Sequence, residues 1–132
     1  MQKRFKEILI FVIGTTPQII TETIYALLHN SPPVYPDEIY VLTTSIGKEK
    51  IIETLINKKI LQDMLKEYEI PEIPFTKENI IVARDSEGKE IEDIRTREDN
   101  EAIGELIIDF IRRKTLEADS GFIVPLLVEE RL

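Results

Sequence analysis

The segment I-L-I-F-V-I-G-T-T-P-Q-I-I-T-E-T-I-Y-A-L-L at residues 8–28 constrains the fold most strongly, because its hydrophobic pattern changes period within a few residues. Residues 7–14 contain a continuous apolar run, at 8–14, that is rich in β-branched side chains, which is typical of a buried strand. Residues 17–29 follow with apolar side chains at helical spacing, and Pro17 suits a first helical turn. A buried strand that runs directly into an amphipathic helix predicts an α/β protein.

The same alternation of strand and helix continues along the chain. It predicts strands at 37–44, 80–85 and 121–128, helices at 48–68 and 96–119, and a short strand at 91–94 that pairs back across a turn at 86–90. Pro125 lacks a ladder donor, so the last strand should lie at a sheet edge or contain a bulge. This order predicts a Rossmann-like α/β fold with three layers, a parallel sheet with helices on both faces.

Composition narrows the class of protein. A length of 132 residues predicts one domain, and the absence of cysteine excludes a disulfide scaffold and suits a cytoplasmic protein. A formal net charge of −8 argues against a partner that is long DNA or RNA, although a small anionic ligand is compatible with it. The apolar run at 8–14 is too short to span a membrane. The spacing of acidic residues suggests no metal site, and we expect no cofactor.

The turn after the first strand carries candidate ligand-binding residues, because ligands of open α/β sheets bind outside the carboxyl ends of the strands. Gly14 allows a close backbone approach, and Thr15 and Thr16 place hydroxyl and N–H groups at a helix start. Gln18 adds an amide that can donate and accept. The alternative is that Thr16 simply caps the helix.

The turn after the second strand, T-T-S-I-G-K-E at 43–49, repeats this chemistry. Its candidates are Thr43, Thr44, Ser45 and Lys48, of which the lysine suits an anion. A capped helix with a solvated lysine explains the same residues. Two such turns at one edge of a parallel sheet predict a shared polar pocket.

A third polar block, D-I-R-T-R-E-D-N at 93–100, opens the last predicted helix. Thr96 is placed as its N-cap, and Asp99 stands where a capping box has its acid. The remaining polar side chains are site candidates, namely Arg95, Arg97 and Asn100. A capped and solvated helix end accounts for them equally well.

Three stretches carry a resemblance to a known family. They are G-T-T-P-Q-I-I-T-E-T-I-Y-A-L-L at 14–28, P-D-E-I-Y-V-L-T-T at 36–44, and the D-I-R-T-R-E-D-N block with the helix that it opens. In this order they resemble the CRISPR-associated CARF-domain proteins (CRISPR-associated Rossmann fold), over nearly the whole chain. The third block is the most specific of the three.

The resemblance implies a function. CARF domains dimerise and bind cyclic oligoadenylate, a second messenger of type III CRISPR systems, across the two-fold axis and over the carboxyl ends of the strands. Binding usually activates an attached effector domain, often a ribonuclease. For this chain the resemblance implies that both turns line the pocket, with Arg95 or Arg97 near the ring or the dimer contact and Asn100 as a polar reader.

Some CARF domains also cleave the ring without a metal, by attack of a ribose 2′-hydroxyl on the adjacent phosphate. Here Thr16 is the candidate catalytic residue for that reaction. The family pattern continues after the last strand with a loop like S-x-A-G-G-R-K-x-M, whose lysine contacts the phosphates, whereas this sequence reads V-P-L-L-V-E-E-R-L.

We therefore expect a single CARF-like domain, residues 1–132, truncated at its C-terminus, that binds the ring as a sensor and cleaves it inefficiently. The alternatives are a standalone ring nuclease and a degenerate remnant that binds nothing.

Overall fold

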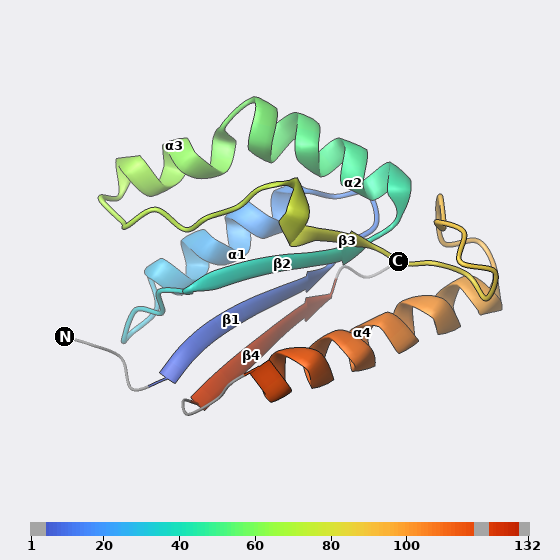
Figure 1. Ribbon diagram of the computed structural model, residues 1–132. Helices are drawn as coiled ribbons and strands as arrows, with labels where there is room; N and C mark the ends of the chain where they lie inside the picture. Colours follow the sequence, from blue (N-terminus) through green and yellow to red (C-terminus); the bar gives the residue numbers. More distant parts are fainter. Residues whose placement is uncertain (1–4, 118–121, 130–132) are drawn as a thin grey trace.

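Four parallel strands form one sheet in the computed structural model, which describes residues 5–117 and 122–129. The strands are β1 (Phe5–Val12), β2 (Glu38–Thr43), β3 (Ile80–Val82) and β4 (Phe122–Glu129), in the order β3-β2-β1-β4. All three neighbouring pairs are parallel, so their carboxyl ends lie at one edge of the sheet (Figure 1). The predicted Rossmann-like α/β fold is confirmed.

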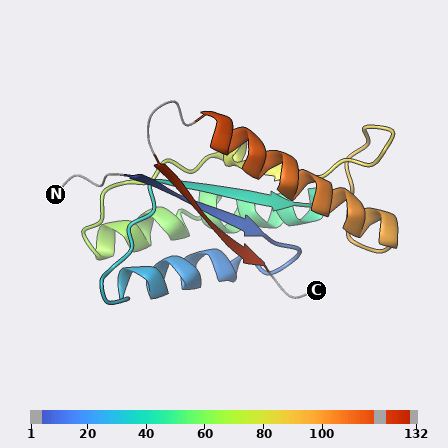
Figure 2. The same ribbon diagram turned by 90° about the horizontal axis from the view of Figure 1, so that it is seen from below.

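Helices cover both faces of the sheet (Figures 1 and 2). One face carries α1 (Gln18–Leu28), α2 (Ser45–Ile51), the π-helical η1 (Ile52–Asn57) and α3 (Ile60–Glu67), while a short 3₁₀ turn, η2 (Lys77–Asn79), leads into β3. The other face carries α4 (Arg97–Glu117). Crossovers between parallel strands are right-handed, so the connection that returns from β3 to β4 places its helix on the opposite face. The direction of winding therefore reverses between β1 and β4.

The central strand β1 is buried on both sides, which explains why it reads as a continuous apolar run. Leu9 and Phe11 point into the core beneath α1, α2 and α3. Ile8 and Ile10 point into the second core, beneath α4. Each of these side chains is at most 1% exposed.

The single helix predicted at 48–68 is wrong, because the chain forms α2, η1 and α3 in its place. The buried side chains Leu55 and Leu61 are six residues apart. At about 3.6 residues per turn, that spacing would rotate Leu61 by roughly 120° off the apolar stripe of a straight helix. The π-helical η1 and the left-handed Lys59 (φ 56°) interrupt the α-helix between α2 and α3, and both leucines are buried.

The short strand predicted at 91–94 is also wrong. The chain does turn back, with Gly88 at a φ of 81° and a single antiparallel bridge between Arg84 and Glu90. Beyond that bridge, the carbonyls of Ile91 and Glu92 accept hydrogen bonds from the first backbone N–H groups of α2. This segment therefore closes the start of a helix and adds no strand.

Pro125 lies in β4, an edge strand that pairs with β1, as predicted. The predicted helix at 96–119 corresponds to α4, and its last two positions lie outside the described residues. No helix among the described residues is both long and apolar enough to cross a membrane.

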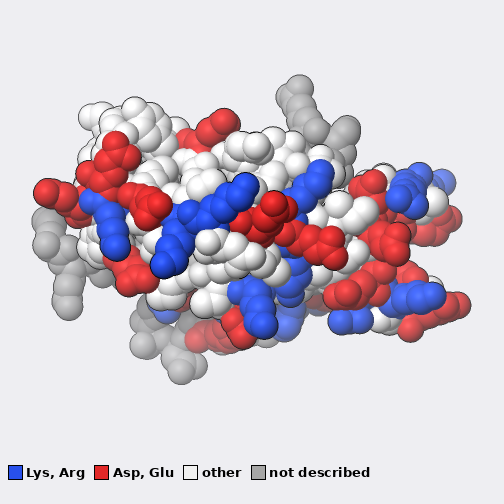
Figure 3. All heavy atoms as spheres, turned by 90° about the horizontal axis from the view of Figure 1, so that it is seen from above, with Lys and Arg blue, Asp and Glu red and all other residues white. Residues whose placement is uncertain are grey.

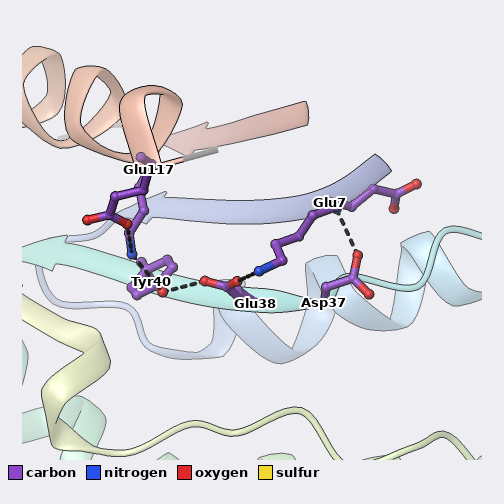
Figure 4. A network of polar contacts seen from close by, with 7 residues as sticks. Glu7, Asp37, Glu38, Tyr40 and Glu117 are labelled. Atoms are coloured by element: carbon purple, nitrogen blue, oxygen red, sulfur yellow. Dashed lines mark hydrogen bonds and ion pairs between the residues drawn. The ribbon is translucent and has the colours of Figure 1, made fainter. Parts of the chain in front are cut away.

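A chain of polar contacts ties α4 to the sheet (Figure 4). The Lys114 ammonium donates to the Tyr40 hydroxyl at 3.0 Å and lies 4.4 Å from the centre of its ring. The Tyr40 hydroxyl donates to Glu38, which also pairs with Lys6 at 2.8 Å. Burial alone would raise the pKa of Glu38, but the hydrogen bonds from Lys6 and Tyr40 lower it below its usual value.

Candidate functional site

Three connections meet at the carboxyl edge of the sheet. Residues 13–18 follow β1, residues 44–47 follow β2, and residues 83–96 follow β3 and lead to α4 (Figure 1). The turn after β1 lies at the point where the winding reverses between β1 and β4. Open α/β sheets bind ligands at such a point, so this edge is the candidate site.

The turn after β1 exposes its polar side chains. Gly14 is buried, whereas Thr15, Thr16 and Gln18 are exposed. Pro17 is the N-cap of α1, and no side chain caps the helix. The alternative in which Thr16 serves only as a helix cap is therefore wrong, and Thr16 is an exposed residue just before the start of α1.

The turn after β2 points its hydroxyls inward. Thr43 and Thr44 are 0% and 1% exposed. The Thr43 hydroxyl donates to the Ile13 carbonyl, and the Thr44 hydroxyl caps α2 by accepting from the Gly47 N–H at 3.1 Å. The Thr43–Ile13 bond joins the two turns, which confirms that they lie at the same edge. Ligand contact by either threonine stays a prediction, and it would require the packing that buries both side chains to open.

Ser45 and Lys48 are half-buried in α2. The Ser45 N–H donates to the Ile91 carbonyl at 2.9 Å, so the first amide of the helix is occupied. The Lys48 ammonium donates to the Ile80 carbonyl at 3.2 Å, at the start of β3. The structure thus directs this lysine along the helix, away from the turn after β1, and its contact with an anion also stays a prediction.

The start of α4 is a capping box, as predicted. The Asp99 carboxylate accepts from the Thr96 N–H at 3.0 Å, and the Thr96 hydroxyl accepts from the Asp99 N–H at 3.1 Å. The Arg95 N–H also donates to Asp99 at 2.9 Å. This bond, with that from Thr96, holds the pKa of Asp99 below its usual value.

The three site candidates around this box are exposed. Arg95 lies 4.0 Å from the Asp93 carboxylate, and Arg97 lies 3.5 Å from that of Glu101. Asn100 bonds through its backbone N–H to the Thr96 carbonyl at 3.2 Å. The structure therefore places these exposed side chains at the same end of the molecule as the turn after β1.

Gly47 is a residue of this edge that the sequence motifs did not single out. A Cβ added to it would lie 2.5 Å from the Gly14 carbonyl oxygen, and closer still to the Thr43 hydroxyl oxygen. The sequence alone places Gly47 in the turn before the predicted helix at 48–68, whereas the structure places it inside α2, where alanine is favoured by about 1 kcal/mol.

Two pockets lined by described residues lie away from the carboxyl edge of the sheet. One, of about 450 Å³, is formed by residues 35–37 and 69–73 at the opposite edge of the sheet, and the other, of about 440 Å³, lies between η1, α3 and residues 70–75. On the face seen in Figure 3, acidic and basic side chains are interspersed, and the described residues form no broad basic area. The described residues also hold no cluster of three metal-ligating side chains.

Comparison with known proteins gives the family. No curated protein and no solved structure matches the chain. A family model described as CRISPR-associated protein NE0113 matches residues 16–127, which include α1, the capping box and most of the sheet. The chain therefore belongs to this family of CRISPR-associated proteins.

Proposed function

We propose that this protein is a CARF-type sensor domain that binds cyclic oligoadenylate in antiviral defence, in a pocket shared by two copies. The CRISPR-associated family supports the context, and the three stretches that resemble CARF domains support the finer assignment. The observation that carries the proposal is the turn after β1, where Thr16 is exposed and its side chain does not cap α1.

This turn has the chemistry that a nucleotide ring needs. Hydroxyls of Thr15 and Thr16 can donate to phosphate oxygens, and the start of α1 carries partial positive charge. The exposed amide of Gln18 can donate and accept together, which matches the mixed edge of adenine. Binding of a small anion here requires no excess of positive charge on the protein.

Arg95 and Arg97 are the proposed mobile phosphate ligands. Their side chains are 66% and 88% exposed, and ion pairs so exposed contribute at most about 1 kcal/mol. Exchanging the present carboxylate for a ring phosphate therefore costs little. An arginine with this freedom can add to binding without a fixed position in the unbound protein.

The same freedom disfavours rapid cleavage of the ring. Stabilising the charge that develops on phosphate depends on donors already held in place. Lys48 is directed to Ile80, and the arginines at this edge are exposed and weakly paired. We therefore propose binding with slow cleavage, and a ring nuclease that uses Thr16 is the second candidate because that hydroxyl is open.

Two copies are proposed because one turn offers too few donors to surround a ring. A two-fold axis through the pocket would repeat Thr15, Thr16 and Gln18 on the other side of the ligand. A ring of repeated nucleotides can present equivalent groups to both copies.

Isothermal titration calorimetry with cyclic tetra- and hexa-adenylate tests the proposal, and linear tetra-adenylate serves as the control ligand. The wild-type protein should bind one of the rings, and Thr16→Ala should weaken that binding about tenfold through the loss of one hydrogen bond to phosphate. The matched control is Thr115→Ala, because Thr115 is exposed on α4 and its hydroxyl donates to the Ile111 carbonyl at 2.8 Å. The proposal fails if neither ring binds at about 100 μM, or if both variants lose the same affinity.

A further inference from the structure

We infer that Gly47 is a positioning residue for the turn after β1, residues 13–18, which is called the ligand turn below. The effect on ligand binding that this inference predicts rests on the proposed function. Gly47 lies in the first turn of α2, between the site candidates Ser45 and Lys48, and its own atoms need not touch a ligand. What it supplies is the space into which the end of β1 packs.

The contacts at Gly47 leave no room for a methyl group. A Cβ there would lie 2.5 Å from the Gly14 carbonyl oxygen and 3.3 Å from the Thr44 hydroxyl oxygen, with the Thr43 hydroxyl oxygen nearest of all. Real Cβ atoms essentially never approach another heavy atom within 3.0 Å. A side chain at this position must therefore move either α2 or its neighbours.

The two nearest neighbours, the Thr43 hydroxyl and the Gly14 carbonyl, both lead to the turn after β1. The Gly14 carbonyl precedes Thr15 directly, so its displacement shifts the exposed hydroxyls. The Thr43 hydroxyl donates to the Ile13 carbonyl, so its displacement removes one of the bonds that hold the residue directly after β1. The start of α2 has little freedom to retreat, because its amides also bond to the carbonyls of Ile91 and Glu92.

The backbone conformation at position 47 does not require a glycine. Among the described residues, Gly88 is the glycine with a positive φ, at 81°, and Gly47 has a helical backbone that alanine adopts readily. Helix propensity favours alanine inside a helix. Gly104, in α4, offers the matched case, because a Cβ added there meets nothing within 4 Å.

The test compares Gly47→Ala with Gly104→Ala by amide NMR of the unliganded proteins and by titration with the ring that the wild type binds. We expect Gly47→Ala to shift the amide signals of Thr15, Thr16 and Gln18 and to weaken ring binding about tenfold, the loss of about one hydrogen bond. Gly104→Ala should leave both unchanged.

The inference is overturned if the turn signals of Gly47→Ala stay at their wild-type positions, or if they move and ring affinity stays at the wild-type value. If the wild type binds no ring, the proposed function fails, and the amide signals still decide whether Gly47 fixes the turn. If Gly47→Ala does not fold, Thr43→Val and Thr43→Ser replace it. Thr43→Val, which lacks the hydroxyl, should shift the turn signals, and Thr43→Ser should not; equal spectra would overturn the inference.

Discussion

Replacing Lys114 by methionine should destabilise the fold, because this lysine connects α4 to β2. Its side chain is 21% exposed, donates to the Tyr40 hydroxyl at 3.0 Å and pairs with Glu117 at 3.2 Å. Its ammonium also lies over the rings of Tyr40 and Phe110 (Figure 4 shows the surrounding contacts). Methionine keeps most of the aliphatic stem and removes the charge.

The size of the effect follows from these contacts. A hydrogen bond to a charged group contributes about 1.5 kcal/mol, the cation–π contact roughly 0.5 kcal/mol, and the more exposed pair with Glu117 little. We expect Lys114→Met to lower the free energy of unfolding by about 2 kcal/mol. For a chain of this length, that corresponds to a fall of about 8 °C in Tm.

Urea unfolding followed by circular dichroism measures this loss, with an unchanged slope as the sign that only stability has altered. The matched control is Arg112→Met, on the same helix, because Arg112 is 68% exposed and lies 4.0 Å from Asp109. It should change the unfolding free energy by less than about 0.5 kcal/mol. Equal stabilities for the two variants would refute the reasoning.

Three further predictions concern acid stability, assembly and chemistry. The pKa values of Glu38 and Asp99 are lowered in the folded protein. The stability that these two groups contribute is therefore present above their unfolded pKa of about 4, and it is lost as the pH falls through their folded pKa values. Urea titrations between about pH 3 and 6 should show this loss, and the loss should be smaller in Glu38→Gln. Sedimentation equilibrium should detect a homodimer at tens of micromolar, roughly the range of ordinary interfaces, and a monomer there would remove the shared pocket. Incubation of labelled ring with protein and EDTA should yield few linear products within minutes, whereas repeated turnover that Thr16→Ala abolishes would favour the ring nuclease.

Much of the fold could be predicted because each strand and helix is specified by its own residues. The apolar run of β1 reflects burial on both faces, and the edge position of β4 follows from Pro125. The cap at the start of α4 depends on Thr96 and Asp99, which are only three residues apart. Such local features are visible in one sequence without any knowledge of tertiary contacts.

The break between η1 and α3 was missed because each half of 48–68 has a helical pattern. What separates them is the need to bury both Leu55 and Leu61 against one sheet, which is a tertiary requirement. The segment at 91–94 was misjudged for a similar reason, because its carbonyls bond to the start of α2, far away in sequence.

The candidate site, like the fold, could be predicted only in part from the sequence. Sequence placed both turns at one edge, since the carboxyl ends of parallel strands must meet there. It could not distinguish the exposed Thr15 and Thr16 from the buried Thr43 and Thr44, because all four are hydroxyls beside a helix start. The distinction arises from the hydrogen bonds and close packing between the turns, which also involve Gly47.

The most direct test of the central claim is to map, by amide NMR, where cyclic tetra- or hexa-adenylate binds. The account predicts that added ring shifts the signals of Thr15, Thr16 and Gln18 and those at the start of α4 around Arg97. The pocket formed by residues 35–37 and 69–73 lies at the opposite edge of the sheet and should not respond. Shifts confined to that pocket, or no shifts with either ring, would contradict a ligand site at the carboxyl edge.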